Sequence, residues 1–212
     1  MVRNLKNQEE YKNMISKPKY KIARRLGAGV FDKCQTPKFL ASQNNKAKSK
    51  KRPKALSEYG AQLIEKQKIR FSYGITEKQL SKYVQKASSA GAGTAEKLYE
   101  DLESRLDNVA YRMGLASSRR ASRQIVSHGH LIVNDRKVTV PSYSLKIGDI
   151  IKIREGSKSK KIWSGIGDRL KDYIFPSWVT FNPEKMEGKV LAKPKNSDTF
   201  FDLNAVLEFY SR

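Results

Sequence analysis

The chain has 212 residues, and its 43 lysines and arginines outnumber its 21 aspartates and glutamates, which gives a formal net charge of +22. Such charge would repel itself in a compact fold unless a polyanion shares the space, so nucleic acid is the expected partner. We expect no membrane partner, because the sequence has no run of about 18 apolar residues and no basic-then-apolar leader. Cys34 is the only cysteine, which excludes an internal disulfide and a cysteine-based zinc site.

The first 55 residues predict a basic, flexible arm. Between Glu10 and Glu58 the only acid is Asp32, against fourteen lysines and arginines. The stretch 42–54 has almost no apolar side chain to bury, so we expect it to become ordered only on a partner's phosphates. A merely solvated linker is the alternative.

Residues 56–93 predict a small helical domain. Its first helix carries an apolar stripe with a basic opposite side, and its second begins at Thr76, with Gln79 at the capping-box spacing. The small residues of 88–94 are typical of a linker and predict a domain boundary. The first stripe consists of Leu63, Ile64, Gln67 and Phe71.

Residues 94–199 predict a second domain that begins with two helices. Leucines at offsets of four predict one continuous amphipathic helix that ends at Gly114, and Ser118 is expected to cap the next. On that second helix Ala121 and Ile125 form the packing side, and the arginine side is expected to be free.

Strands are expected next, in a small curled antiparallel sheet. The alternating pairs are Val138/Val140, Leu145/Ile147 and Ile151/Ile153, with turns at 134–135 and 148–149. Residues 178–181 and 189–193 predict a further hairpin, and 203–212 a closing helix that completes the helical domain. The predicted fold class is therefore α+β: a helical N-terminal domain, two helices packed on a small antiparallel sheet, and the arm.

His128 and His130 raise the question of a catalytic or metal site. Two histidines separated by one residue, with no carboxylate or cysteine at ligand spacing, are too few for either. We expect His128 to end a helix and His130 to begin a strand. The neighbouring arginines have no acids at i+4, so a phosphate-binding face is favoured over a solvated helix face, because guanidinium groups make two parallel hydrogen bonds to phosphate oxygens.

These segments together resemble a known family. Residues 102–155 resemble the small RNA-binding module named after small-subunit ribosomal protein number four, and 56–74 resemble the helical segment of that protein. The stretches 185–190 and 207–212 are similar to its later hairpin and tail, and 21–30 match more loosely. Some members carry a zinc-binding cysteine cluster here, which Cys34 alone cannot form.

The resemblance implies a non-enzymatic structural protein without cofactors, which binds a junction of small-subunit ribosomal RNA early in assembly. It also implies contacts with neighbouring ribosomal proteins, a contribution to decoding accuracy, possible binding to its own messenger RNA, and a cytoplasmic place in the small subunit of a bacterium or an organelle. The alternatives are an RNA-modifying enzyme, for which too little chain remains, and an RNA chaperone or heat-shock factor that rescues stalled ribosomal particles.

The RNA-binding residues expected on these grounds are basic, polar and aromatic side chains of the arm, the helical domain and the module. They are Arg24, Arg25, Lys50, Lys51, Arg52, Lys54, Tyr59, Lys66, Lys68, Arg70, Tyr73, Arg105, Arg112, Arg119, Arg120, Arg123, Gln124, Ser127, His128, Asn134 and Lys137.

Overall fold

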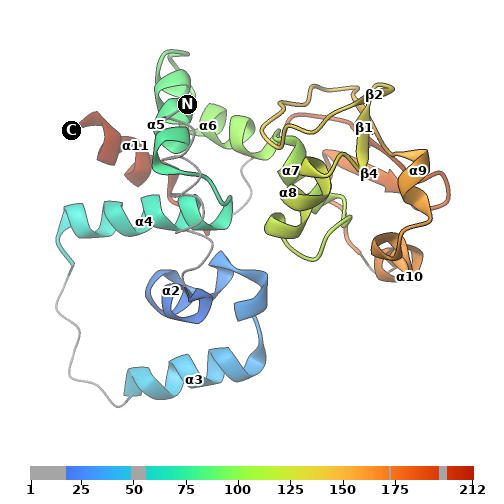
Figure 1. Ribbon diagram of the computed structural model, residues 1–212. Coiled ribbons are helices and arrows are strands. Elements are labelled where there is room, and N and C mark those ends of the chain that lie inside the picture. The colour runs from blue at the N-terminus through green and yellow to red at the C-terminus, as the bar shows by residue number, and fades with distance from the viewer. Residues whose placement is uncertain (1–17, 49–55, 172, 196–199) are drawn as a thin grey trace, which may run out of the picture. The chain divides into compact units, whose positions relative to one another are not determined.

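The computed structural model describes residues 18–48, 56–171, 173–195 and 200–212 (Figure 1). They form two compact units, residues 18–98 with 200–212 and residues 99–195. The predicted class of helices with a small antiparallel sheet is confirmed. None of the helices in these ranges combines the length and hydropathy of a bilayer-spanning segment. The predicted domain boundary at residues 93 and 94 lies a few residues before the division between the units, and it stays a prediction.

The first unit is helical. Helix α11 packs along α4 and also touches α5, so the end of the chain lies against helices formed about 130 residues earlier. Thr76 caps α5 through the predicted reciprocal capping box with Gln79. The helices are α2 (Lys19–Leu26), α3 (Pro37–Lys48), α4 (Glu58–Ser72), α5 (Glu77–Ser88) and α11 (Leu203–Ser211), with short 3-10 turns at η1 (Ala28–Val30) and η2 (Asp32–Cys34).

The predicted flexible arm is folded wherever the structure describes it. Residues 19–48 form α2, η1, η2 and α3, and Ala23, Cys34 and Phe39 form a small buried cluster. The Ser72 hydroxyl donates to the Val30 carbonyl, and the ring of Phe31 meets that of Phe71 edge-on at 6.4 Å. The few apolar residues of this stretch thus share one core. The prediction of a flexible arm rested on the high basic charge and did not take this spacing into account. Residues 1–17 and 49–55 lie outside the described residues.

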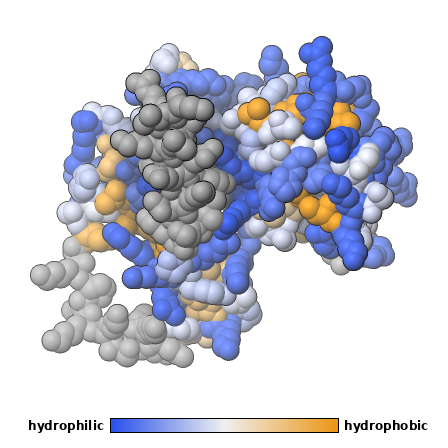
Figure 2. Space-filling view, in the orientation of Figure 1, coloured by the Kyte–Doolittle hydropathy of each residue, from blue (hydrophilic) through white to orange (hydrophobic). Residues whose placement is uncertain are grey.

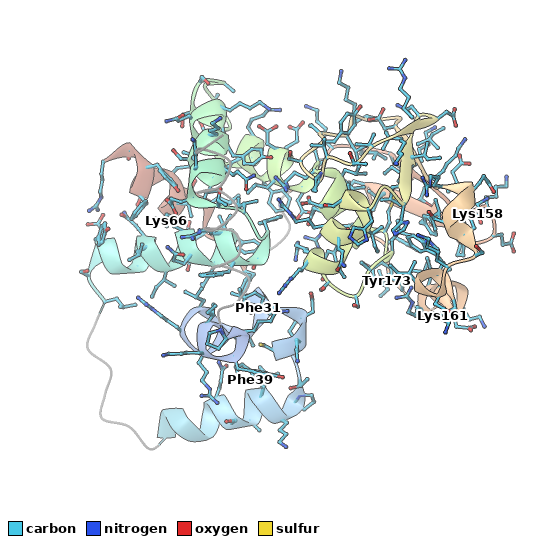
Figure 3. All side chains as sticks on the ribbon, in the orientation of Figure 1. Phe31, Phe39, Lys66, Lys158, Lys161 and Tyr173 are labelled. Carbon is cyan, nitrogen blue, oxygen red and sulfur yellow. The ribbon has the colours of Figure 1, made fainter. Side chains whose placement is uncertain are left out.

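The predicted apolar stripe of α4 is not its most buried side, because Gln62, Lys66, Ile69 and Ser72 are the buried residues of this helix. Lys66 is 7% exposed, because α11 covers it (Figure 3). Its ammonium lies 3.0 Å from Glu77 Oε1 and 4.2 Å from the centre of the Phe209 ring. The predicted stripe of Leu63, Ile64, Gln67 and Phe71 is only partly buried. The apolar pattern did not predict the burial of Lys66. A long lysine stem can be buried when its ammonium group pairs with an acid.

Glu77 joins α11 to the other helices. Its Oε1 accepts a hydrogen bond from the Tyr210 hydroxyl at 2.6 Å as well as the one from Lys66. Burial acts to raise the pKa of the Glu77 carboxyl, but the hydrogen bonds from Tyr210 and Lys66 outweigh it and lower the pKa below its ordinary value. Burial, and then the bond to Glu77, raise the pKa of Tyr210.

The second unit combines helices with one antiparallel sheet. Helix α6 (Thr94–Glu103) leads into it, and the sheet has the order β2-β1-β3-β5-β4. Its core includes Leu106, Met113, Ile125, Ile151 and Trp163. The remaining elements are α7 (Leu106–Arg112), α8 (Arg119–Ser127), β1 (Leu131–Val133), β2 (Arg136–Lys137), β3 (Ile150–Ile153), α9 (Glu155–Lys158), η3 (Lys161–Trp163), α10 (Ile166–Lys171), β4 (Val179–Asn182) and β5 (Glu187–Val190).

The single helix predicted before Gly114 is broken in two. Arg105 is extended, with φ −65° and ψ 138°, and it pairs with Ser144 as an isolated β-bridge. The first amides of α7 donate to a loop, Leu106 N to the Tyr143 carbonyl and Asp107 N to the Pro141 carbonyl. This loop replaces the preceding helical turn, which a periodicity argument could not detect. Gly114 ends α7 as predicted, with φ +70°.

The sheet contains fewer early strands than predicted. Only the Ile151/Ile153 pair lies in a strand, while Val140 and Ile147 are exposed in a loop. Asn134 and Asp135 make the predicted tight turn, both with positive φ. The later hairpin of β4 and β5 forms, but its second strand is Glu187–Val190 and not the predicted 189–193. It joins the same sheet, where β5 pairs with β3.

We predict that Glu77→Gln lowers the melting temperature at pH 7 and that the difference from wild type shrinks below about pH 4.5, the ordinary value for this group. The lowered pKa means that the ionised carboxyl stabilises the fold above its unfolded-state pKa, and that this stability is lost as the pH falls through the folded-state pKa. Thermal melts of both proteins between pH 7 and pH 4 measure it. If the melting temperatures of the two proteins differed by the same amount at every pH, the ionised Glu77 carboxyl would not contribute to stability in this way.

We also predict that Gly188→Ala destabilises the second unit by about 1 to 3 kcal/mol, as overpacking of a core does. A Cβ there would lie 2.7 Å from Met113 Sδ and 2.9 Å from the Thr180 carbonyl, and the second atom is backbone of the paired strand. Gly156→Ala is the control, since its Cβ would meet nothing within 4 Å. Urea unfolding of both variants measures the difference, and equal midpoints would contradict the packing.

Candidate nucleic-acid interface

Two buried carboxylates organise the arginines of the second unit. Glu103, at the end of α6, is 0% exposed and accepts hydrogen bonds from both Arg112 Nε at 2.8 Å and Arg112 Nη2 at 2.9 Å. Asn108 Nδ2 donates to the same carboxylate at 2.7 Å. The side chain of Asn108 in turn accepts from Arg119 Nε at 2.7 Å, so α6, α7 and α8 are joined by one polar network.

Asp107 is the second carboxylate, on α7. It accepts two hydrogen bonds from Arg105, at 3.0 Å from Nε and 2.6 Å from Nη2. Arg123 Nη1 approaches it at 3.5 Å from α8. The Ser122 hydroxyl donates to the Asp107 carbonyl, which fixes α8 against α7. Arg105, Arg112, Arg119 and Arg123 thus meet around the two carboxylates of Glu103 and Asp107.

This network corrects the expectation of a free arginine face on α8. No acids lie at i+4 along the helix, but Glu103 and Asp107 supply them from other elements: Glu103 Oε1 lies 3.7 Å from Arg119 Nη2. Arg119 also stacks over the Tyr111 ring at 4.6 Å. The side chains of Arg112, Arg119 and Arg123 stay 17–21% exposed, so they reach solvent while the carboxylates contact their guanidinium groups. Ser118 caps α8 and Ile125 is buried, both as predicted.

The outer side of α8 carries the other candidates. Arg120, Gln124 and Ser127 are exposed, and the Ser127 hydroxyl donates to the Arg123 carbonyl at 2.8 Å. His128 is the C-cap of α8, as predicted, and it is exposed. Hydrophilic residues cover most of the face of this unit seen in Figure 2.

Two further candidates lie in the β1–β2 hairpin, Asn134 in its turn and Lys137 on β2. Asn134 is exposed, but its amide is used internally: Oδ1 accepts from Ile150 N at 3.0 Å and Nδ2 donates to Asp149 at 2.8 Å. Lys137 is exposed on β2. Its side chain crosses Gly129, because a Cβ on Gly129 would lie 2.4 Å from Lys137 Cε and 3.3 Å from Nζ. Lys137 and His128 are therefore brought together around Gly129.

Three predicted contact residues are buried, which argues against a direct contact with RNA. Arg105 is 1% exposed and paired with Asp107. Tyr73 packs on the Phe201 ring at 5.7 Å, and Lys66 is enclosed by Glu77 and α11. These three residues stabilise the fold, and we leave them out of the proposed RNA-binding set.

The other candidates of the first unit differ in their exposure to solvent and in whether an acid pairs with them. Arg24 and Arg25 are exposed on α2, and Tyr59 is half-exposed against Phe209 at 5.5 Å. Lys68 lies 2.6 Å from Glu65, and Arg70 lies 3.6 Å from Glu77, so both are partly neutralised. The remaining predictions, Lys50, Lys51, Arg52 and Lys54, lie outside the described residues.

Sequence reasoning missed the basic segment after β3. Arg154, Lys158, Lys160 and Lys161 lie in or beside α9 and η3, and Figure 3 shows Lys158 and Lys161 on this segment. The run of lysines at 158–161 was visible in the sequence, but the structure was needed to place it beside His130. His130 is 6% exposed, and its Nδ1 lies 3.0 Å from the Ser157 hydroxyl. Burial, and then Lys160, His128 and Arg154, lower the pKa of this imidazole.

We predict that Glu103→Gln destabilises the second unit by about 3 to 5 kcal/mol, because it breaks the ion pair that the fully buried Glu103 carboxylate makes with the partly buried Arg112. Glu155→Gln is the control, since its ion pair with Lys158 is exposed, and such pairs contribute about 0 to 1 kcal/mol. Chemical unfolding monitored by the fluorescence of Trp163 and Trp178 measures both. Similar midpoints for the two variants would show that Glu103 does not hold the network.

Two family models cover most of the chain. Residues 14–103 match the "Ribosomal protein S4/S9 N-terminal domain" and residues 104–151 match the "S4 domain". The junction between the two matches falls at the break between α6 and α7, where Glu103 and Arg105 begin the polar network.

Curated relatives match over nearly their whole length. The small ribosomal subunit protein uS4 of Aquifex aeolicus is 40% identical over 204 residues, which cover 92% of this chain and 97% of the relative. That of Laribacter hongkongensis is 43% identical over 205 residues, and that of Roseiflexus is 39% identical over 202, with the same coverage. These are names of ribosomal proteins and not of enzymes, as the sequence predicted. The chain belongs to the small ribosomal subunit protein uS4 family.

Proposed function

We propose that the chain is a structural constituent of the small ribosomal subunit in the cytoplasm, where it binds ribosomal RNA and neighbouring ribosomal proteins. The family membership supports the place in the small subunit. The observation that carries RNA binding is the set of arginines held by buried carboxylates on α7 and α8. The chain's net charge of +22 supplies a general attraction to a polyanion such as RNA.

The arrangement suits recognition of RNA by shape. The major groove of an A-form helix is deep and narrow, so a protein that binds a helical junction meets phosphates and ribose hydroxyls more than base edges. Arginines held by carboxylates on α7 and α8 keep a set spacing, which the phosphates of one particular RNA fold can match. The proposed contacts are Arg112, Arg119, Arg120, Arg123, Gln124, Ser127, His128, Asn134 and Lys137, with Arg24, Arg25, Tyr59, Lys68, Arg70, Lys50, Lys51, Arg52 and Lys54 as contacts from the first part of the chain.

Finer parts of the proposal rest on the family resemblance alone. They are early binding at a junction in the five-prime domain of the RNA, a contribution to decoding accuracy, and repression of the protein's own messenger RNA. We also propose that the chain is divided into a basic N-terminal arm of residues 1–55, a helical domain of residues 56–93 completed by 200–212, and an RNA-binding module of residues 94–199.

Co-sedimentation separates a structural subunit from a transient factor. We expect the protein to remain on small subunits in a one-to-one ratio through a high-salt wash. An RNA chaperone or heat-shock factor that rescues stalled ribosomal particles would wash off. Loss of the protein in the wash would therefore contradict the proposed function and favour that alternative.

We predict that Arg120→Gln weakens binding to a transcript of the five-prime domain and leaves the melting temperature nearly unchanged, because Arg120 is exposed and glutamine has a similar helix propensity. Log affinity against log salt should flatten by roughly 0.7 to 0.9 for one lost phosphate contact. Arg120→Lys is the matched control and should keep the slope. Arg119→Gln and Arg123→Gln should also lower the melting temperature, because their partners are Asn108, Glu103 and Asp107. An unchanged slope and affinity for Arg120→Gln would place this side of α8 away from RNA.

A further inference from the structure

Basic residues from three segments lie next to Gly129 or His130 in the turn that follows α8. Gly129 has φ +67° and carries the Lys137 side chain across its Cα, which a Cβ would block. His128 precedes it at the end of α8, and its ring meets the His130 ring edge-on at 5.9 Å. We name His128, Lys137, Arg154 and Lys160 the Gly129 cluster.

The segment 154–160 wraps around His130 and brings the remaining members to it. Arg154 N donates to the His130 carbonyl at 2.9 Å, Ser157 N donates to the Arg154 carbonyl at 2.8 Å, and Lys160 N donates to the Ser157 carbonyl at 3.1 Å. The Ser157 hydroxyl contacts His130 Nδ1 at 3.0 Å. This backbone ladder fixes Arg154 and Lys160 relative to the imidazole.

No acidic side chain among the described residues forms an ion pair with the Gly129 cluster. The ion pairs of this segment involve other groups: Glu155 pairs with Lys158, and Asp135 and Glu187 approach Lys152. Arg154 Nε is buried and makes no hydrogen bond within the described chain. The charged groups that act on His130 are Lys160, His128 and Arg154, all of them basic. Concentrated positive charge with a buried unpartnered donor indicates a site for an anion.

We propose that the Gly129 cluster binds one phosphodiester group of RNA, and that His130 beneath it takes up a proton when that phosphate binds. The proposal rests on the RNA-binding function proposed above and adds a site and a dependence on pH to it.

The proton uptake follows from the charges around His130. In the free protein, burial and three basic neighbours disfavour the imidazolium, so His130 is neutral at pH 7. A phosphate on the cluster offsets the repulsion from Lys160, His128 and Arg154, and therefore raises the pKa of His130. By linkage, the affinity for RNA must increase as the pH falls through the window between the free and bound pKa values. A rise of about one pKa unit gives about tenfold tighter binding at the acidic end of that window.

Two measurements test this on the full chain. The first is the affinity for a five-prime-domain transcript at constant ionic strength between pH 5.5 and pH 8, with an expected gain of up to about tenfold towards acid. The second is the NMR titration of the two histidines, free and bound, which should show a higher pKa for His130 in the complex. The double variant with His128→Gln and His130→Asn should bind with an affinity that no longer depends on pH.

Controls separate this site from RNA binding in general. Lys185→Gln removes an exposed charge elsewhere in the unit and should keep the pH dependence. Lys160→Gln, also exposed, should flatten the salt slope by roughly 0.7 to 0.9 and reduce the pH dependence, which keeps the test decisive if His130→Asn does not fold. Binding that is tight but independent of pH, or a His130 pKa that RNA leaves unchanged, would overturn the inference alone. No binding at any pH would overturn the proposed function as well.

Discussion

The polar network around Glu103 and Asp107 is the constraint on which the second unit depends. Two carboxylates buried between α6, α7 and α8 are stable only because arginines and Asn108 satisfy them, and the arginines are fixed only because the carboxylates are there. The break at Arg105 belongs to the same arrangement, since it turns Glu103 and Asp107 towards the arginines while the 141–145 loop satisfies the freed amides. Stability and the proposed binding surface therefore rest on the same side chains.

This arrangement gives a physical reason for so much basic charge in a folded protein. Guanidinium groups held from behind have already lost much of their rotamer freedom, so little entropy remains to be lost when they meet phosphates. The side chains of Arg112 and Arg123 keep about a fifth of their surface exposed, so a ligand in solution can reach them. In the first unit a basic side chain is also held by an acidic partner. Lys66 is buried against Glu77 and the Phe209 ring, and it joins α11 to α4.

The sequence predicted those parts of the fold that local chemistry determines. The capping box at Thr76, the cap at Ser118, the end of α7 at Gly114 and the turn at 134–135 all follow from neighbouring residues, and all were predicted. The errors occurred where distant segments decide. The 141–145 loop breaks a helix whose apolar spacing is continuous, α11 covers the basic side of α4, and Glu103 and Asp107 neutralise arginines that lack acids along their own helix. Candidate sites chosen by charge therefore included Arg105 and Lys66, which are buried, and missed Arg154 and Lys160.

The RNA-binding surface that we propose consists of the carboxylate-held arginines of α7 and α8. A cryo-EM structure of the small ribosomal subunit containing this chain tests it most directly. We expect Arg112, Arg119 and Arg123 to keep their pairs with Glu103 and Asp107 while other guanidinium nitrogens lie within about 3 Å of phosphate oxygens. A subunit in which that surface faces solvent or only protein, or in which the arginines leave the carboxylates to reach RNA, would contradict it.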